Sequence, residues 1–190
     1  MESVTVRADA RSNRDQILAA ALIAFREKGI DVPMKEIADL AGVGVGTLYR
    51  HFPDRDAVLT AIAHPYLADL AARAATARAE EPTAWTALAR FLHECAQARL
   101  GALAAALEPT LHTCIRNNPE LTEIRAAVVD HLTAMTDAAH AEGTLRTDVG
   151  TADIANLMTV QIYARAGENT AEATRRVVDL ILDGLRTAPG

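Results

Sequence analysis

The chain has 190 residues, of which 50% are apolar, and a net charge of −6, so it can build a hydrophobic core in one or two small domains. This charge argues against a protein that coats nucleic acid or anionic membrane through bulk electrostatics, so any contact with DNA must be local. No apolar run approaches the ~20 residues that span a bilayer, and the first residues lack a secretion signal. Cys95 and Cys114 are too few for a disulfide framework. We expect a cytoplasmic protein with free thiols and no membrane contact.

Apolar residues recur at spacings of three and four almost throughout the chain, which is typical of amphipathic helices rather than strands. The pattern predicts an all-α protein with about nine helices. The first ten or so residues show no such period, and we expect them to form a tail. A first helix then carries Ile17 and Phe25 on one face and ends at Gly29.

Two short helices follow. Pro33 suits the first turn of the second helix, and Gly42 ends it. The third helix runs from about residue 44 to His51, where Pro53 prevents its continuation. The shortness of these helices contrasts with the longer apolar periods further along the chain.

The fourth helix begins near Arg55, with Asp54 as its cap. Pro65 predicts a kink within it, because proline removes one backbone hydrogen bond. The change to longer helices near residue 60 separates a domain of residues 1–60 from a domain of residues 61–190. The expected inner faces of the later helices are Trp85, Leu88, Leu92 and Cys95; Leu100, Leu103 and Leu107; Leu121, Ile124, Val128, Leu132 and Met135; Ile154, Leu157 and Met158; and Val177, Val178, Ile181 and Leu185.

The second and third helices are joined by a short turn that contains glycine, which is the layout of a helix-turn-helix. Leu48 and Phe52 lie four residues apart and can anchor the third helix, so Thr47, Arg50 and His51 fall on its exposed side. Such a helix suits the major groove, where amides and hydroxyls meet phosphates and an arginine reaches a guanine edge. The alternative is that the aromatic side chains beside the anchors are ordinary half-buried surface residues.

Three segments at fixed offsets strengthen this interpretation. They read ILAAALIAFREKGID in the first helix, MKEIADLAGVGVGTLYRHF in the helix-turn-helix and PDRDAVL at the start of the fourth helix. Together they resemble the TetR family of transcriptional regulators, over the stretch from Ile17 to Leu59. The resemblance implies DNA contacts from the start of the second helix, the third helix and the start of the fourth, through Lys35, Val45, Gly46, Thr47, Tyr49, Arg50, His51 and Arg55.

These implied contacts fall into two kinds. The resemblance assigns Tyr49 and His51 to phosphates, which position the domain on the duplex. It assigns Val45, Thr47 and Arg50 to base edges, which carry sequence information.

The sequence departs from the family pattern at two places. Gly44 replaces the usual serine before the recognition helix, so the N-cap hydroxyl is missing. Val32 and Pro33 replace the usual hydroxyl residues at the head of the second helix, which removes a phosphate donor. We expect DNA binding to be weaker or less rigidly posed than in relatives that keep both.

One recognition helix reads only a few base pairs, so helix-turn-helix proteins bind inverted repeats as two-fold dimers. The last two helices have a broader apolar face than one neighbour would cover, although part of this face must be intramolecular core. In the TetR family the corresponding pair forms a four-helix bundle with its mate. The expected interface residues are Ile154, Leu157, Val177, Val178, Ile181, Leu182 and Leu185.

The resemblance also implies a small-molecule pocket among the middle helices and an effector that changes the separation of the two recognition helices. A tilt of the fourth helix about Pro65 would produce such a change. Polar groups on apolar faces are the candidate pocket residues because they need partners when buried, although for each histidine a structural hydrogen bond is the favoured explanation. The candidates are His64, His93, Cys95, Leu103, His112, His131, Met158 and Gln161.

Two His-x-Cys repeats, at residues 93–95 and 112–114, invite a zinc interpretation. Residues two apart on a helix project about 200° from one another, so neither repeat can close on one ion. A site that joins one residue from each repeat stays open. Since HExxH, CxxC, phosphate-loop and nucleophile-elbow motifs are missing, we expect no enzyme, metal or cofactor.

We predict a homodimeric regulator, most simply a repressor, whose operator binding responds to a small molecule. The alternative is a helical enzyme or binding protein with a vestigial helix-turn-helix.

Overall fold

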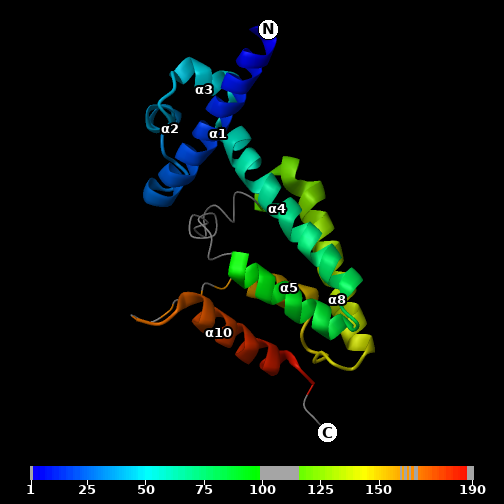
Figure 1. Ribbon diagram of the computed structural model, residues 1–190. Coiled ribbons are helices and arrows are strands. Elements are labelled where there is room, and N and C mark those ends of the chain that lie inside the picture. The colour runs from blue at the N-terminus through cyan, green and yellow to red at the C-terminus, as the bar shows by residue number, and fades with distance from the viewer. Residues whose placement is uncertain are drawn as a thin grey trace. The chain divides into compact units, whose positions relative to one another are not determined.

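The computed structural model describes residues 2–98, 116–158, 160, 162, 164 and 167–187. These residues form eight α-helices and one short 3₁₀ helix, and their only strand-like pairing is an isolated bridge between Leu145 and Arg186 (Figure 1). The predicted all-α fold class is confirmed. Within the described ranges, no helix is long and apolar enough to cross a membrane.

The chain divides into two compact units. The first contains the residues up to Tyr66 together with the segment that ends at Thr122. The second contains the residues from Leu67 to Gly101 and from Glu123 onward.

Helix α1 spans Glu2–Lys28 and ends before Gly29, whose φ of 80° lies in the left-handed region that glycine tolerates. Ile17 and Phe25 are buried on its inner face, as predicted. The helix also includes the residues expected to form a tail. Extending an existing helix needs only one backbone hydrogen bond per residue, so it does not require the apolar period on which the prediction relied.

Helices α2 (Met34–Ala41) and α3 (Val45–His51) pack with α1 and with each other (Figure 1). Gly42, with φ of 68°, ends α2, and its N–H donates to the carbonyls of Ala38 and Asp39. This left-handed glycine gives the sharp turn that the helix-turn-helix layout requires.

Helix α4 spans Arg55–Glu80 and begins as predicted, because the Asp54 side chain accepts a hydrogen bond from the Ala57 N–H at 2.8 Å. It continues through Pro65 as one helix. The division between the two units falls inside α4, directly after Tyr66. The kink at the proline stays a prediction.

The second unit contains α5 (Ala84–Ala98) and almost all of α8 (Thr122–Ala141), which follows the 3₁₀ helix Pro119–Leu121. Glu142, just after α8, caps α5 across the fold: its carboxylate accepts from the Ala84 N–H at 2.7 Å. The predicted inner face of α5 is buried, and the predicted helix with Leu100, Leu103 and Leu107 lies outside the described residues.

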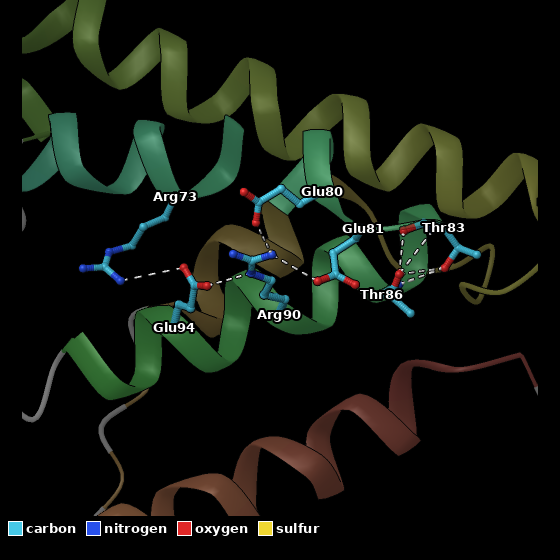
Figure 2. Close-up of polar contacts among 7 residues, drawn as sticks. All are labelled: Arg73, Glu80, Glu81, Thr83, Thr86, Arg90 and Glu94. Atoms are coloured by element: carbon cyan, nitrogen blue, oxygen red, sulfur yellow. Dashed lines mark hydrogen bonds and ion pairs between the residues drawn. The ribbon is translucent and has the colours of Figure 1, made fainter. Parts of the chain in front are cut away.

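Arg90 on α5 organises a network of charged side chains where α4 passes into α5 (Figure 2). Its guanidinium donates to Glu94 at 2.8 Å, to Glu80 at 2.8 Å and to Glu81 at 3.2 Å. Arg73 on α4 lies 3.7 Å from the other oxygen of Glu94. The hydrogen bonds to Glu94, Glu80 and Glu81 raise the pKa of Arg90, so its guanidinium stays positively charged at every accessible pH.

Helices α9 (Thr151–Leu157) and α10 (Thr170–Leu185) complete the second unit, and α10 packs against α5. Helix α9 contains Ile154 and Leu157 of its predicted inner face, and Met158 is its C-cap residue. The β-branched residues Val160 and Ile162 follow it, and such residues lower helix propensity. Asn169 caps α10 by accepting from the Ala171 and Glu172 N–H groups at 3.0 and 3.2 Å.

Candidate DNA-binding surface and effector cavity

Two apolar anchors hold α3 in the first unit. Leu48 is 0% exposed and Phe52 is 3% exposed, which confirms the predicted anchoring role of the i, i+4 pair. The helix begins after Gly44, whose φ of −65° and ψ of 143° are extended and which makes no side-chain cap bond. The Thr47 N–H donates to the Gly44 carbonyl at 2.8 Å instead.

The polar side of α3 faces away from these anchors. Arg50, Tyr49 and Gly46 are exposed, with Tyr49 at 48%, while Val45, Thr47 and His51 are half-buried. In the described part of the chain, Arg50 and Tyr49 form no ion pair or hydrogen bond, so both are available to a ligand. Of the three residues predicted on the exposed side, Arg50 is exposed, whereas Thr47 and His51 are half-buried because they lie next to the buried anchors Leu48 and Phe52. The DNA contacts themselves stay a prediction.

The other two cations of the predicted set are engaged within the protein. Lys35 Nζ lies 3.0 Å from Asp39 Oδ2, one turn further along α2. Arg55 Nη1 lies 3.3 Å from Asp31 Oδ1, and its Nη2 donates to the carbonyls of Asp31 and Val32 at 3.2 and 3.0 Å. Arg55 therefore ties the start of α4 to the turn between α1 and α2, a structural role that sequence reasoning missed.

A second arginine contact supports the end of α3. The guanidinium of Arg14 on α1 lies over the Phe52 ring, 5.4 Å from its centroid, in the geometry of a cation–π interaction. The apolar anchor is thus covered on one side by a charged group. No local pattern in the sequence signals this contact, because the two residues lie far apart in the chain.

A cavity of about 30 Å³ lies in the second unit, where α5 and α10 meet the segment after α9. Its lining is apolar apart from one thiol. It brings together Cys95 and Met158 from the predicted pocket with Leu157, Val178 and Ile181 from the predicted interface. The remaining lining residues are Leu92, Ala96, Val160 and Ile162.

Family comparisons agree with this geometry. Residues 17–62 match the bacterial regulatory proteins of the tetR family, and residues 81–187 match the C-terminal domain of SbtR-like transcriptional regulators. The chain belongs to the TetR family. This membership confirms the resemblance seen in the sequence and the expectation of a regulator rather than an enzyme, since the family consists of transcriptional regulators.

Solved structures include full-length TetR relatives. The TetR transcription regulatory protein from Mycobacterium vanbaalenii is 33% identical, with 96% of this chain and 99% of that chain covered and a TM-score of 0.56. The regulator SCO0520 from Streptomyces coelicolor is also 33% identical, with 93% and 99% covered and a TM-score of 0.51. The ketosteroid transcriptional regulator KstR2 of Mycobacterium tuberculosis, 20% identical over 92% of this chain and 95% of its own, shares the fold with a TM-score of 0.73.

Curated relatives of this TetR-family protein match a shorter stretch. HTH-type transcriptional regulators of Staphylococcus aureus, from strains USA300 and NCTC 8325, are 45% identical over 51 residues. The aligned stretch is 26% of this chain and 28% of those relatives. The match to the curated relatives therefore covers about a quarter of this chain.

The predicted pocket histidines have protein partners or lie on the surface. His93 Nε2 is 2.9 Å from Asp179 Oδ1, which links α5 to α10, and Arg78 Nη1 donates to His131 Nδ1 at 2.9 Å. His64 is exposed. None of the three lines the described cavity. Leu103, His112 and Gln161 lie outside the described residues, as does the repeat that the alternative zinc site needs.

The seven residues predicted at the dimer interface differ in burial. Ile154, Val178 and Leu182 are buried within the protomer, so they have little surface to offer a partner. On α10, the exposed large apolar side chain is Leu180, at 65%, which the sequence prediction passed over. The half-buried members of the set are Leu157, Val177, Ile181 and Leu185.

Proposed function

We propose that this TetR-family protein is a homodimeric DNA-binding repressor that acts in the cytoplasm and responds to a small-molecule effector. The observation that carries the proposal is the state of α3: buried Leu48 and Phe52 fix it, while Arg50 and Tyr49 are exposed and unpaired among the described residues. An exposed, unpaired arginine on a rigid helix is suited to a guanine edge. DNA binding is assigned to residues 1–60, and effector binding and dimerisation to residues 61–190.

Each side chain of the recognition helix has a distinct part in this proposal. Arg50 reads a base, with Val45 and Thr47 beside it, because base edges are reached from the exposed side of a helix in the major groove. Tyr49 and His51 contact phosphates and set the register of the helix. Two copies related by a two-fold axis read an inverted repeat, whose half-site spacing follows from the dimer.

The experiment that tests this function is selection of bound fragments from the host's genomic DNA by the purified full-length chain. We expect the retained fragments to share an inverted repeat and their binding to weaken steeply as salt rises, because phosphate contacts release counterions. If no fragment is enriched over a random-sequence duplex, the protein is instead a helical binding protein with a vestigial helix-turn-helix.

The cavity between α5 and α10 is the proposed entry point of the effector. Its lining of eight apolar side chains and the Cys95 thiol favours an uncharged, apolar ligand. A volume of about 30 Å³ has room for about one water molecule, so a ligand must widen the cavity by separating the two helices. Because α10 is also the proposed dimer helix, its movement would shift the partner protomer. That shift would change the spacing of the two recognition helices.

A further inference from the structure

The candidate DNA-binding surface, defined as Lys35, residues 45–51 and Arg55, is poor in available positive charge. Lys35 and Arg55 are both paired with carboxylates, and Arg50 is the one cation of this surface without such a partner among the described residues. Proteins normally neutralise DNA phosphates with free lysine and arginine side chains. The pairing of Lys35 and Arg55 with carboxylates therefore affects the affinity of this surface for DNA.

The pair of Lys35 and Asp39 differs from the pair at Arg55. Arg55 is held by two carbonyls as well as a carboxylate, so it belongs to the frame of the unit. Lys35 and Asp39 are 75% and 60% exposed and lie on the solvent side of α2, while Ile37 and Ala38 of the same helix are buried. The pair is thus accessible to a duplex.

Asp39 adds little to the stability of its own helix, because its i, i+4 pair with Lys35 is exposed to solvent. Its side chain caps nothing, and Lys35 is its one hydrogen-bonding partner within the described residues. It lies in the last turn of α2, where the helix dipole disfavours a negative charge. Its main effect is therefore expected on the charge of the surface, where it neutralises a lysine.

We infer that Asp39 attenuates DNA binding by neutralising Lys35. The inference rests on the proposed function, which places Lys35 against the phosphates. As an ion pair, the two side chains carry no net charge and release no counterion from DNA, so Lys35 contributes little to affinity. Discrimination of the operator then depends more heavily on Arg50, since sequence-independent attraction is held low.

The test replaces Asp39 by the neutral isostere. We expect Asp39→Asn to steepen the slope of log affinity against log salt by about 0.9 per protomer, or about 1.8 per dimer. At about 0.15 M salt this corresponds to an affinity gain of about five-fold for each protomer. Fluorescence anisotropy of a labelled random-sequence duplex, titrated with full-length protein at several salt concentrations, measures both quantities.

Two controls isolate the mechanism. Asp69→Asn breaks another exposed i, i+4 pair, with Arg73 at 2.6 Å in the second unit, and changes the net charge equally. We expect it to leave the slope unchanged. The double variant Lys35→Gln with Asp39→Asn again has a neutral pair of side chains, so its slope should return to that of the wild type.

An unchanged slope for Asp39→Asn, or a double variant that keeps the gain, would overturn the inference while leaving the proposed function intact. Thermal unfolding of Asp39→Asn should match the wild type, because no cap is lost, so a change in affinity reports on charge rather than folding. Failure of every variant to bind either this duplex or any genomic fragment would overturn the proposed function itself, and the inference with it.

Discussion

Arg50 and Tyr49 are the side chains of the recognition helix that the rest of the protein leaves exposed and unpaired within the described ranges. The neighbouring cations Lys35 and Arg55 are already engaged. The proposed DNA contacts therefore depend on which polar side chains of α3 have no partner within the protein.

Arg50→Ala tests the division of labour on the recognition helix. We expect it to remove the preference for one base in each half-site, at a cost of about 1–3 kcal/mol for the correct operator, because a bidentate base contact is lost. His51→Ala should weaken binding to all sequences alike, since a phosphate contact carries no sequence information. Titration of the operator and of single-base variants separates the two; equal losses at every site from both substitutions would contradict the assignment.

The two glycines that flank the turn between α2 and α3 should respond oppositely to substitution. Gly44 has φ of −65°, and a Cβ there would lie 3.9 Å from Thr47 Oγ1, so Gly44→Ser fits and restores an N-cap. We expect a gain of a few tenths of a kcal/mol in the free energy of unfolding. Gly42→Ala should lose about 1 kcal/mol, because its φ of 68° is unfavourable for alanine. Urea unfolding measures both, and a stabilising Gly42→Ala would refute the role of the turn.

At the scale of elements, α4 is the helix shared by the two units, and the division between them falls directly after Tyr66, next to Pro65. Proline inside a helix lacks one hydrogen bond and so marks the weakest point along the helix. Arg55 at the start of the same helix ties α4 to the turn between α1 and α2. A bend at this point would move the recognition helix of one protomer relative to its mate.

Pro65→Ala should therefore change regulation as well as the stability of α4. We expect α4 to become more stable, by up to about 3 kcal/mol, because the missing hydrogen bond is restored. Operator affinity and its response to effector should both change, as measured by operator titration with and without effector. His64→Ala, at the exposed neighbouring position, serves as the control. If Pro65→Ala left affinity and response as they are in the wild type, the proline would have no role as a hinge.

The contact between α5 and α10, where the cavity lies, can be tested with Leu92→Ala. Leu92 is 6% exposed and lines the cavity, so its truncation should lower the free energy of unfolding by about 2–5 kcal/mol. Benzene should recover part of this loss by filling the enlarged apolar space, whereas benzoate should not, because burying its charge is costly. Urea unfolding with each compound gives the comparison. Equal recovery by benzoate would contradict the proposed preference for uncharged ligands.

At the scale of the whole molecule, the proposed activity requires two protomers, and the structure narrows the surface that can join them. The apolar residues Val178 and Leu182 of α10 are buried in the core of the protomer, so a partner cannot contact them. Leu180 is exposed on the same helix. The dimer contact is therefore expected on the side of α10 that turns away from the core.

Leu180→Glu should prevent dimerisation, because two carboxylates would then be buried at a two-fold contact. Sedimentation velocity should show a monomer, and operator affinity should fall while thermal unfolding of the protomer changes little. Ala171→Glu adds the same charge on the opposite side of α10, about 180° around the helix, and should leave the dimer intact. A dimer that survives Leu180→Glu would place the interface elsewhere.

The fold class, most helix boundaries and the helix-turn-helix could be predicted from the amino-acid sequence, because their signals are local. Gly29, Gly42 and Asp54 act within a few residues of the helix ends that they terminate or cap, and a period of three to four residues marks each inner face. The same locality explains why Leu48 and Phe52 could be assigned as anchors.

Which polar groups are paired and which apolar groups are buried could be seen only in the folded chain. Arg55 contacts Asp31, 24 residues away, and His93 meets Asp179 on another helix; no pattern along the chain signals either pairing. Likewise, helical periodicity marks an apolar face but does not say how much of it a neighbouring helix covers. Burial and pairing depend on what packs against a side chain in space, and that is a property of the folded chain rather than of any segment of it.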